Sequence, residues 1–156
     1  MISTRTRLLL LSATLLGGLL AGSNLDRAVV AMPAWSQMET FSWAAFSRRA
    51  DLGNGLVLYP IEALLGAALA LSAAISYGYE RAANHSVSRV LWSAVIFVVG
   101  GLLITLKAAP IMLNLSHTVD LATLHQDFGQ FYFWGDIRGM FEVLAFIAEL
   151  WALSAL

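Results

Sequence analysis

The sequence has no cysteine and little charge. None of its 156 residues is cysteine, and only 12% are charged. The absence of cysteine excludes disulfide scaffolds, thiol catalysis and thiolate metal sites. An average soluble domain has about 25% charged residues, so this composition argues against a soluble globular protein. Nine basic and ten acidic residues give a net charge of −1, and without a basic field we expect no binding to nucleic acid.

Hydrophobic residues make up 59% of the chain and gather in four stretches. These stretches cover about residues 8–31, 56–79, 90–113 and 131–155. A transmembrane helix needs about 20 mostly apolar residues to cross the bilayer, and the stretches lack the period-two alternation of barrel strands. Because lipid admits only helices or closed barrels, the sequence predicts a single all-α domain over residues 1–156, a four-helix transmembrane bundle.

The two longer connections between these stretches carry aromatic and polar side chains. Residues 38–50 mix Phe41, Trp43 and Phe46 with Ser, Glu and Arg. This mixture is typical of a short amphipathic helix at the membrane interface, here between the first and second spans. Residues 114–130 are interpreted as a second interfacial segment.

Basic residues near the span ends predict the orientation, because cytoplasmic loops are enriched in Lys and Arg. One end of the predicted bundle has four arginines, and the other has two: Arg5, Arg7, Arg81 and Arg89 against Arg48 and Arg49. We therefore predict a multi-pass protein of the cell membrane with both termini in the cytoplasm. Residues 5–20 also fit a signal peptide, but residues 21–23 form a poor cleavage site, so we expect the first span to be retained.

The fourth span carries ionisable residues on one helical face. At about 100° per residue, Arg138, Glu142 and Glu149 fall within roughly 60° of one another. A charge at the centre of a span costs about 2.5–3.5 kcal/mol, so this face should point into the bundle. One interpretation is an internal salt bridge with Glu149 reaching the cytoplasmic interface. The other is the wall of a ligand or proton site.

Polar residues of the other spans are expected at a similar depth. Glu62 lies one turn from Tyr59 and follows Pro60 in the second span, and Lys107 and Asn114 share a face of the third. Glu62 either has a structural role, in which it reaches the interface or pairs with Arg138, or is a second carboxylate in the same site as Glu142. The predicted catalytic residues are Glu62, Glu142 and Arg138, and the predicted substrate-binding residues are Asn24, Tyr59, Lys107, Asn114, Trp134 and Asp136.

Without cysteine, a metal ion would need histidine and carboxylate ligands. His117, His125 and Asp127 supply two imidazoles and a carboxylate. Their spacing matches no His-Glu-x-x-His or Glu-x-x-His pattern. They are weak candidates, and we expect no metal site; the sequence identifies no cofactor.

Several strings together resemble a known family. They are Met32-Pro33-Ala34-Trp35, Ala50-Asp51-Leu52-Gly53, Leu58-Tyr59-Pro60, Ala108-Ala109-Pro110-Ile111-Met112 and residues 131–138, Phe-Tyr-Phe-Trp-Gly-Asp-Ile-Arg. The chain is similar in these to the small four-helix integral membrane proteins grouped with anthrone oxygenases. The resemblance implies a four-helix membrane protein and oxidation of a small lipophilic aromatic substrate.

The sequence thus leaves more than one function open. In the first, an oxygenase or oxidoreductase acts on a small lipophilic molecule: a buried Glu62 or Glu142 removes a proton, and Arg138 or Lys107 stabilises the anion. In the second, the chain is a non-catalytic subunit that binds a second copy or another protein of a membrane complex through its small-residue faces. In the third, it carries a small molecule or protons across the bilayer.

Overall fold

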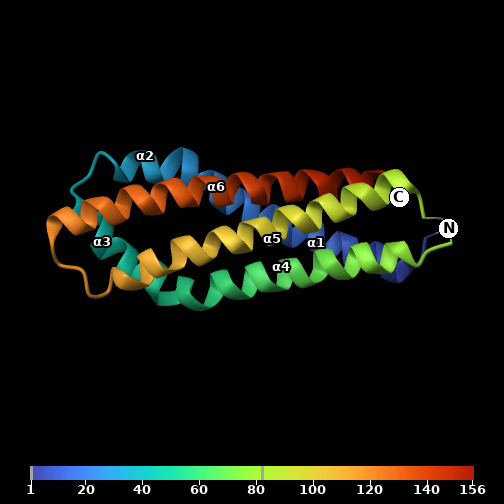
Figure 1. The fold of residues 1–156 in the computed structure, drawn as a ribbon, viewed down its shortest axis with the longest axis horizontal. Coiled ribbons are helices and arrows are strands. Elements are labelled where there is room, and N and C mark those ends of the chain that lie inside the picture. Colours follow the sequence, from blue (N-terminus) through green and yellow to red (C-terminus); the bar gives the residue numbers. More distant parts are fainter. Residues whose placement is uncertain (1, 82) are drawn as a thin grey trace.

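Helices make up nearly the whole chain. The structure is a computed structural model that describes residues 2–81 and 83–156, in which there is no strand. Four helices are long: α1 (Thr4–Asp26), α4 (Gly55–Gly78), α5 (His85–Asn114) and α6 (Leu121–Ser154). They lie side by side and alternate in direction, so that α1 begins and α6 ends at the same end of the molecule (Figure 1). The short helices α2 (Met32–Trp35) and α3 (Thr40–Arg49) lie at the opposite end (Figure 1).

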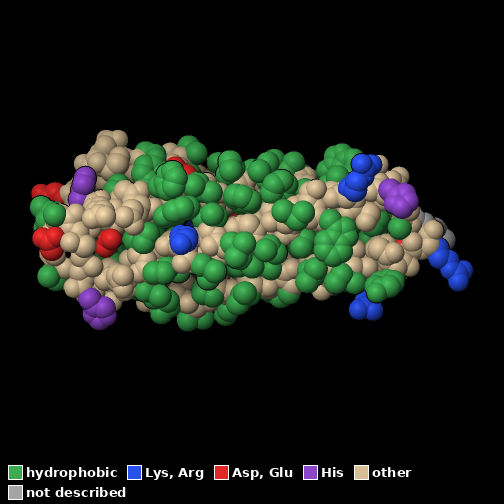
Figure 2. Space-filling model, in the orientation of Figure 1, with side chains coloured by type: hydrophobic (Ala, Val, Ile, Leu, Met, Phe, Trp, Pro, Cys, Tyr) green, Lys and Arg blue, Asp and Glu red, His purple; other side chains and the backbone are tan. Residues whose placement is uncertain are grey.

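Three helical stretches are long and apolar enough to cross a membrane: Thr4–Ser36, Thr40–Gly78 and His85–Asn114. This agrees with a membrane protein. Helix α6, with 34 residues, is also long enough to cross, but Arg138, Glu142 and Glu149 interrupt its apolar run. On the face shown in Figure 2, hydrophobic side chains are spread over the middle of the molecule, whereas most charged side chains and the histidines lie towards the two ends.

Capping side chains fix where three of the long helices begin. Ser3, Asn84 and Asp120 each accept a hydrogen bond from a backbone N–H in the first turn of the helix that follows, which satisfies one of the unpaired donors there. The N–H of Thr123 holds the pKa of Asp120 below its ordinary value. Helix α6 then runs unbroken from residue 121, so residues 121–130 of the predicted interfacial segment belong to the same helix as the fourth apolar stretch. The cap at Asp120 starts a helix that continues directly into the fourth apolar stretch.

The buried side chains form two apolar clusters, one towards each end. The cluster near the termini contains Leu10, Tyr77 and Leu91, among others. The cluster at the opposite end contains Trp43 and Phe131. Between the clusters, the helices meet through small residues and polar groups. On α4, Gly66 is buried, and so are Ala70 and Ala73, which belong to the cluster near the termini; this is as expected for a face of close helix packing.

Two π-helical turns shape the end that carries α2 and α3. The first, Arg27–Ala31, joins α1 to α2, and the second, Ala50–Asn54, joins α3 to α4. The backbone of Gly53 leaves the helical region, with φ −87° and ψ −117°, so the chain bends there. Helix α3 lies within the predicted segment 38–50 and buries Trp43, Ala44 and Ser47, and it contacts α6. Such π-helical turns are rare and occur often at functional sites.

Candidate functional site

A hydrogen-bonded network links α1 and α6 midway along the molecule. The Nη2 of Arg138 donates to Oδ1 of Asn24 over 2.8 Å, and Nδ2 of Asn24 donates to Oε2 of Glu142. The Nε of Arg138 also lies 3.8 Å from Oε1 of Glu142. A Cβ at Gly139 would lie 3.4 Å from Cβ of Asn24, within van der Waals contact, so α1 and α6 are closely packed here. The amide thus connects a guanidinium and a carboxylate that are one helical turn apart.

A buried donor group of Arg138 is left over in this network. The Nε of Arg138 is buried and has no hydrogen-bond partner among the described residues. Buried polar groups normally have a partner. A bound molecule with an oxygen acceptor would supply one here.

Glu149 lies two turns further along α6 and is almost completely buried. Its exposed fraction is 2%, and none of the described residues gives its Oε2 a hydrogen bond. A Cβ at Gly17 of α1 would lie only 2.7 Å from that oxygen. The interpretation in which Glu149 reaches the cytoplasmic interface is therefore wrong. The side chain meets the small face of α1, and α6 continues past it to Ser154.

Glu142 and Glu149 line one cavity of about 30 Å³. The other polar side chain in its wall is Thr105 of α5, and the remaining wall is apolar or glycine. A second cavity of about 10 Å³ lies nearer the π-helical turns and is lined by residues that include Asn24, Arg27 and Asp136. Since one water needs about 10–15 Å³ measured in this way, the larger space has room for about two waters and the smaller for about one, and both are too small for a ring system.

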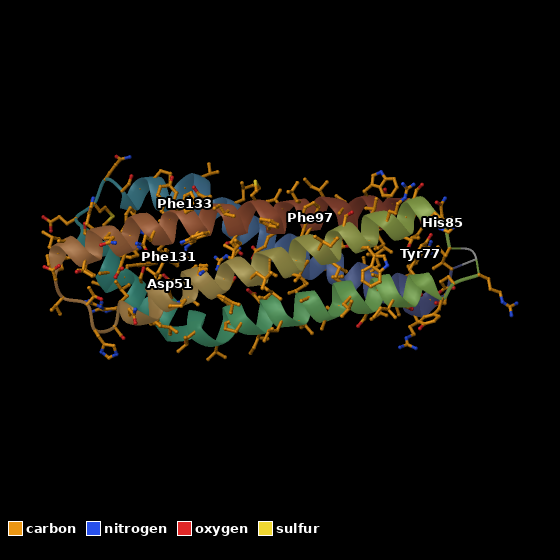
Figure 3. All side chains as sticks on the ribbon, in the orientation of Figure 1. Asp51, Tyr77, His85, Phe97, Phe131 and Phe133 are labelled. Atoms are coloured by element: carbon orange, nitrogen blue, oxygen red, sulfur yellow. The ribbon has the colours of Figure 1, made fainter. Side chains whose placement is uncertain are left out.

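The second cavity adjoins an ion pair that connects the two π-helical turns. Nη2 of Arg27 lies 2.5 Å from Oδ1 of Asp51, and Asp51 is buried, with an exposed fraction of 6%. The guanidinium also lies against three aromatic rings, with Cζ at 5.6, 6.0 and 5.3 Å from the ring centroids of Trp35, Tyr59 and Phe131. Asp51 and Phe131 both lie at the end of the molecule that carries α3 (Figure 3).

Asp51 was missed by the sequence analysis as a site residue. In the sequence it is a single acidic residue after two arginines, which is ordinary for an exposed loop. In the structure, the π-helical turn Ala50–Asn54 carries its side chain into the interior. The sequence feature that could have indicated this is an aspartate two residues before Gly53-Asn54-Gly55, at the start of an apolar span.

The other predicted residues divide between the interior and the surface. Tyr59 contacts Arg27 through its ring, Asp136 is exposed but lines the smaller cavity, and Trp134 packs on Phe133 with ring centroids 5.1 Å apart. Glu62 is half-buried, without a hydrogen bond or ion pair to any described residue. Lys107 and Asn114 lie on exposed positions of α5, apart from the network.

The histidines lie at the surface. His117 and His125 are exposed and Asp127 is half-buried. Across residues 2–81 and 83–156, the structure gathers no group of three or more His, Asp or Glu side chains that could hold a metal ion.

The arrangement joins a guanidinium, an amide and two carboxyl groups between two apolar clusters. Such a site can hold a polar or anionic group of a bound molecule and can accept or release a proton. Comparison of the chain with models of known protein families, with curated proteins and with solved structures found no match.

Proposed function

We propose that the chain is an integral protein of the cell membrane in which all four long helices cross the bilayer as a bundle. For α6, whose apolar run is interrupted by charged residues, the distribution of side chains around the helix supports a membrane crossing. Its ionisable side chains Arg138, Glu142 and Glu149 face the other helices. Its exposed side chains in the same region form an apolar stripe of Met140, Leu144, Ile147, Leu150 and Trp151. A helix with this division is suited to lipid on one side and a polar interior on the other.

The proposed orientation has both termini in the cytoplasm and α3 at the outer interface. The excess of arginine near the termini supports it. Because the chain has no cysteine, single cysteines at exposed serines test it without background from the protein itself. We expect a membrane-impermeant maleimide to label Ser116→Cys on intact cells and Ser86→Cys only after the membrane is opened. The reverse pattern would overturn the orientation, and equal labelling of both would overturn the membrane crossing.

We further propose that the network of Asn24, Arg138 and Glu142 binds the polar end of a small lipophilic molecule and that the protein oxidises it. The observation that carries this is the unused Nε of Arg138 beside a carboxylate, in the otherwise apolar middle of the helices. Glu142 would remove a proton from an activated C–H group, and Arg138 would stabilise the anion. Dioxygen would be the oxidant, as the resemblance to anthrone oxygenases implies.

Substrate entry requires the helices to separate, because the cavities of about 30 and 10 Å³ are too small for a ring system. A lipophilic molecule would reach the network from the bilayer, between α1 and α6.

The test is oxygen uptake by the purified protein in lipid vesicles, with anthrone as the probe. We expect uptake that depends on both protein and anthrone and exceeds the rate in empty vesicles. Uptake no faster than in empty vesicles would overturn the oxidation for this substrate class and favour a non-catalytic membrane subunit.

A further inference from the structure

The cavity lined by Glu142 and Glu149 contains a buried carboxyl group, that of Glu149, which has no role in the proposed oxidation. We call this space of about 30 Å³ the acidic chamber; its wall includes Gly17 of α1, Ala63 and Gly66 of α4, Thr105 of α5 and the two glutamates of α6. The carboxyl of Glu149 lies in it almost completely buried, with an unpartnered Oε2. Glycine at position 17 leaves the space that this oxygen fills, since a Cβ there would lie 2.7 Å from it.

The polar groups of the acidic chamber are all hydrogen-bond acceptors. The hydroxyl of Thr105 donates its proton to the carbonyl of Gly101 over 2.9 Å, so only its lone pairs face an occupant. An ionised carboxylate has no donor either. A chamber of this kind needs an occupant that brings a proton or a positive charge.

The charges around the acidic chamber leave one carboxylate without compensation. Arg138 lies beside Glu142 and balances one negative charge. Helix α1 adds no ionisable side chain to the wall, the nearest ionisable group of α4 is another acid, Glu62, and Lys107 of α5 is exposed. Burying an unpaired ionised carboxylate is costly, so Glu149 needs a proton or another cation beside it.

We propose that the acidic chamber binds a single proton, carried by Glu149 and connected to Glu142 through one or two waters. The two carboxyl groups are two helical turns apart, about 10 Å along α6 at about 1.5 Å per residue, and the volume fits waters between them. Divalent metal ions are disfavoured, because Ca²⁺ and Mg²⁺ take about six or more oxygen ligands and the wall offers two carboxyl groups and one hydroxyl. The proton stays available to Glu142 without opening the bundle to water.

Infrared spectroscopy of the purified protein in lipid vesicles tests this directly. A protonated carboxyl group gives a C=O stretching band that a carboxylate lacks. We expect one such band at neutral pH, its loss in Glu149→Gln, and its persistence in Glu39→Gln, which removes an exposed glutamate at the other end of the molecule. Absence of the band from the wild-type protein at neutral pH, or its persistence in Glu149→Gln, would overturn the proposal.

A pair of glycine variants on α1 keeps the proposal testable if Glu149→Gln does not fold. In Gly17→Ala the new methyl group displaces the carboxyl of Glu149, so we expect the band to shift. In Gly22→Ala, where a Cβ meets nothing within 4 Å, the band should stay in place. An unshifted band in Gly17→Ala would contradict the assignment to Glu149. If the band fades in sodium chloride but persists in choline chloride, the cation bound at neutral pH in the presence of sodium is Na⁺, and the proposal of a proton site is overturned.

Discussion

Asp51→Asn is expected to lower the free energy of unfolding by about 3 kcal/mol or more, as found when one partner of a buried ion pair is removed. The change keeps the shape of the side chain but leaves the guanidinium of Arg27 without its carboxylate. The side chains of Arg27 and Asp51 are 18% and 5% exposed, so water compensates little. For a chain of this length the loss corresponds to a Tm lower by about 10 °C, measured by thermal unfolding in detergent micelles.

The matched control is Asp26→Asn, which neutralises an exposed aspartate next to Arg27 in the sequence. We expect its free energy of unfolding to stay within about 0.5 kcal/mol of the wild-type value. Equal effects of the two substitutions would show that general charge, and not the ion pair, stabilises this end.

Two further variants separate charge from stacking. Replacing both partners, Arg27→Leu with Asp51→Leu, should recover much of the lost stability, because no unpaired charge then remains buried. Arg27→Lys keeps the charge but loses the planar group that lies against Trp35, Tyr59 and Phe131. We expect Arg27→Lys to fall between the wild-type protein and Asp51→Asn.

Helical periodicity within a single helix predicted the part of the site that lies on α6. Arg138, Glu142 and Glu149 share one face at 100° per residue, and the structure turns that face towards the other helices. Asn24 was predicted because it is a polar residue expected at the same depth as the polar residues of the other spans. The unbroken length of α6 was not foreseen, since its first turns are polar and resemble a loop.

The rotation of α5 could not be predicted in the same way. A Cβ at Gly100 would lie 2.5 Å from the ring of Phe141, so α5 and α6 approach each other along this glycine face. This contact turns Thr105 and Ala108 inwards and leaves Lys107, between them, exposed. The sequence shows Gly100 and Gly101 but does not show that they contact α6. This contact decides which polar residue of α5 lines the interior.

Glu142→Gln is expected to lower the rate of anthrone-dependent oxygen uptake by about 10²-fold or more, the usual range for loss of a general base. The amide keeps the size of the side chain, and its oxygen still accepts the hydrogen bond from Asn24, so this contact between α1 and α6 should survive. What the amide cannot do is take up a proton. The amide also leaves Arg138 without its carboxylate, which lowers the free energy of unfolding as in Asp51→Asn. Uptake is therefore measured well below the Tm and expressed per folded protein, which separates a chemical role from a structural one.

Glu62→Gln provides the comparison for Glu142→Gln, because both side chains are glutamates near the middle of the helices. Glu62 has no hydrogen bond or ion pair to a described residue, whereas Glu142 is held beside Arg138 and Asn24. A base held beside a cation that can stabilise the anion should carry the larger effect, so we expect Glu62→Gln to keep most of the uptake. If Glu62→Gln instead shows the large loss, the base is on α4; if both variants keep full uptake, proton removal by either glutamate is excluded.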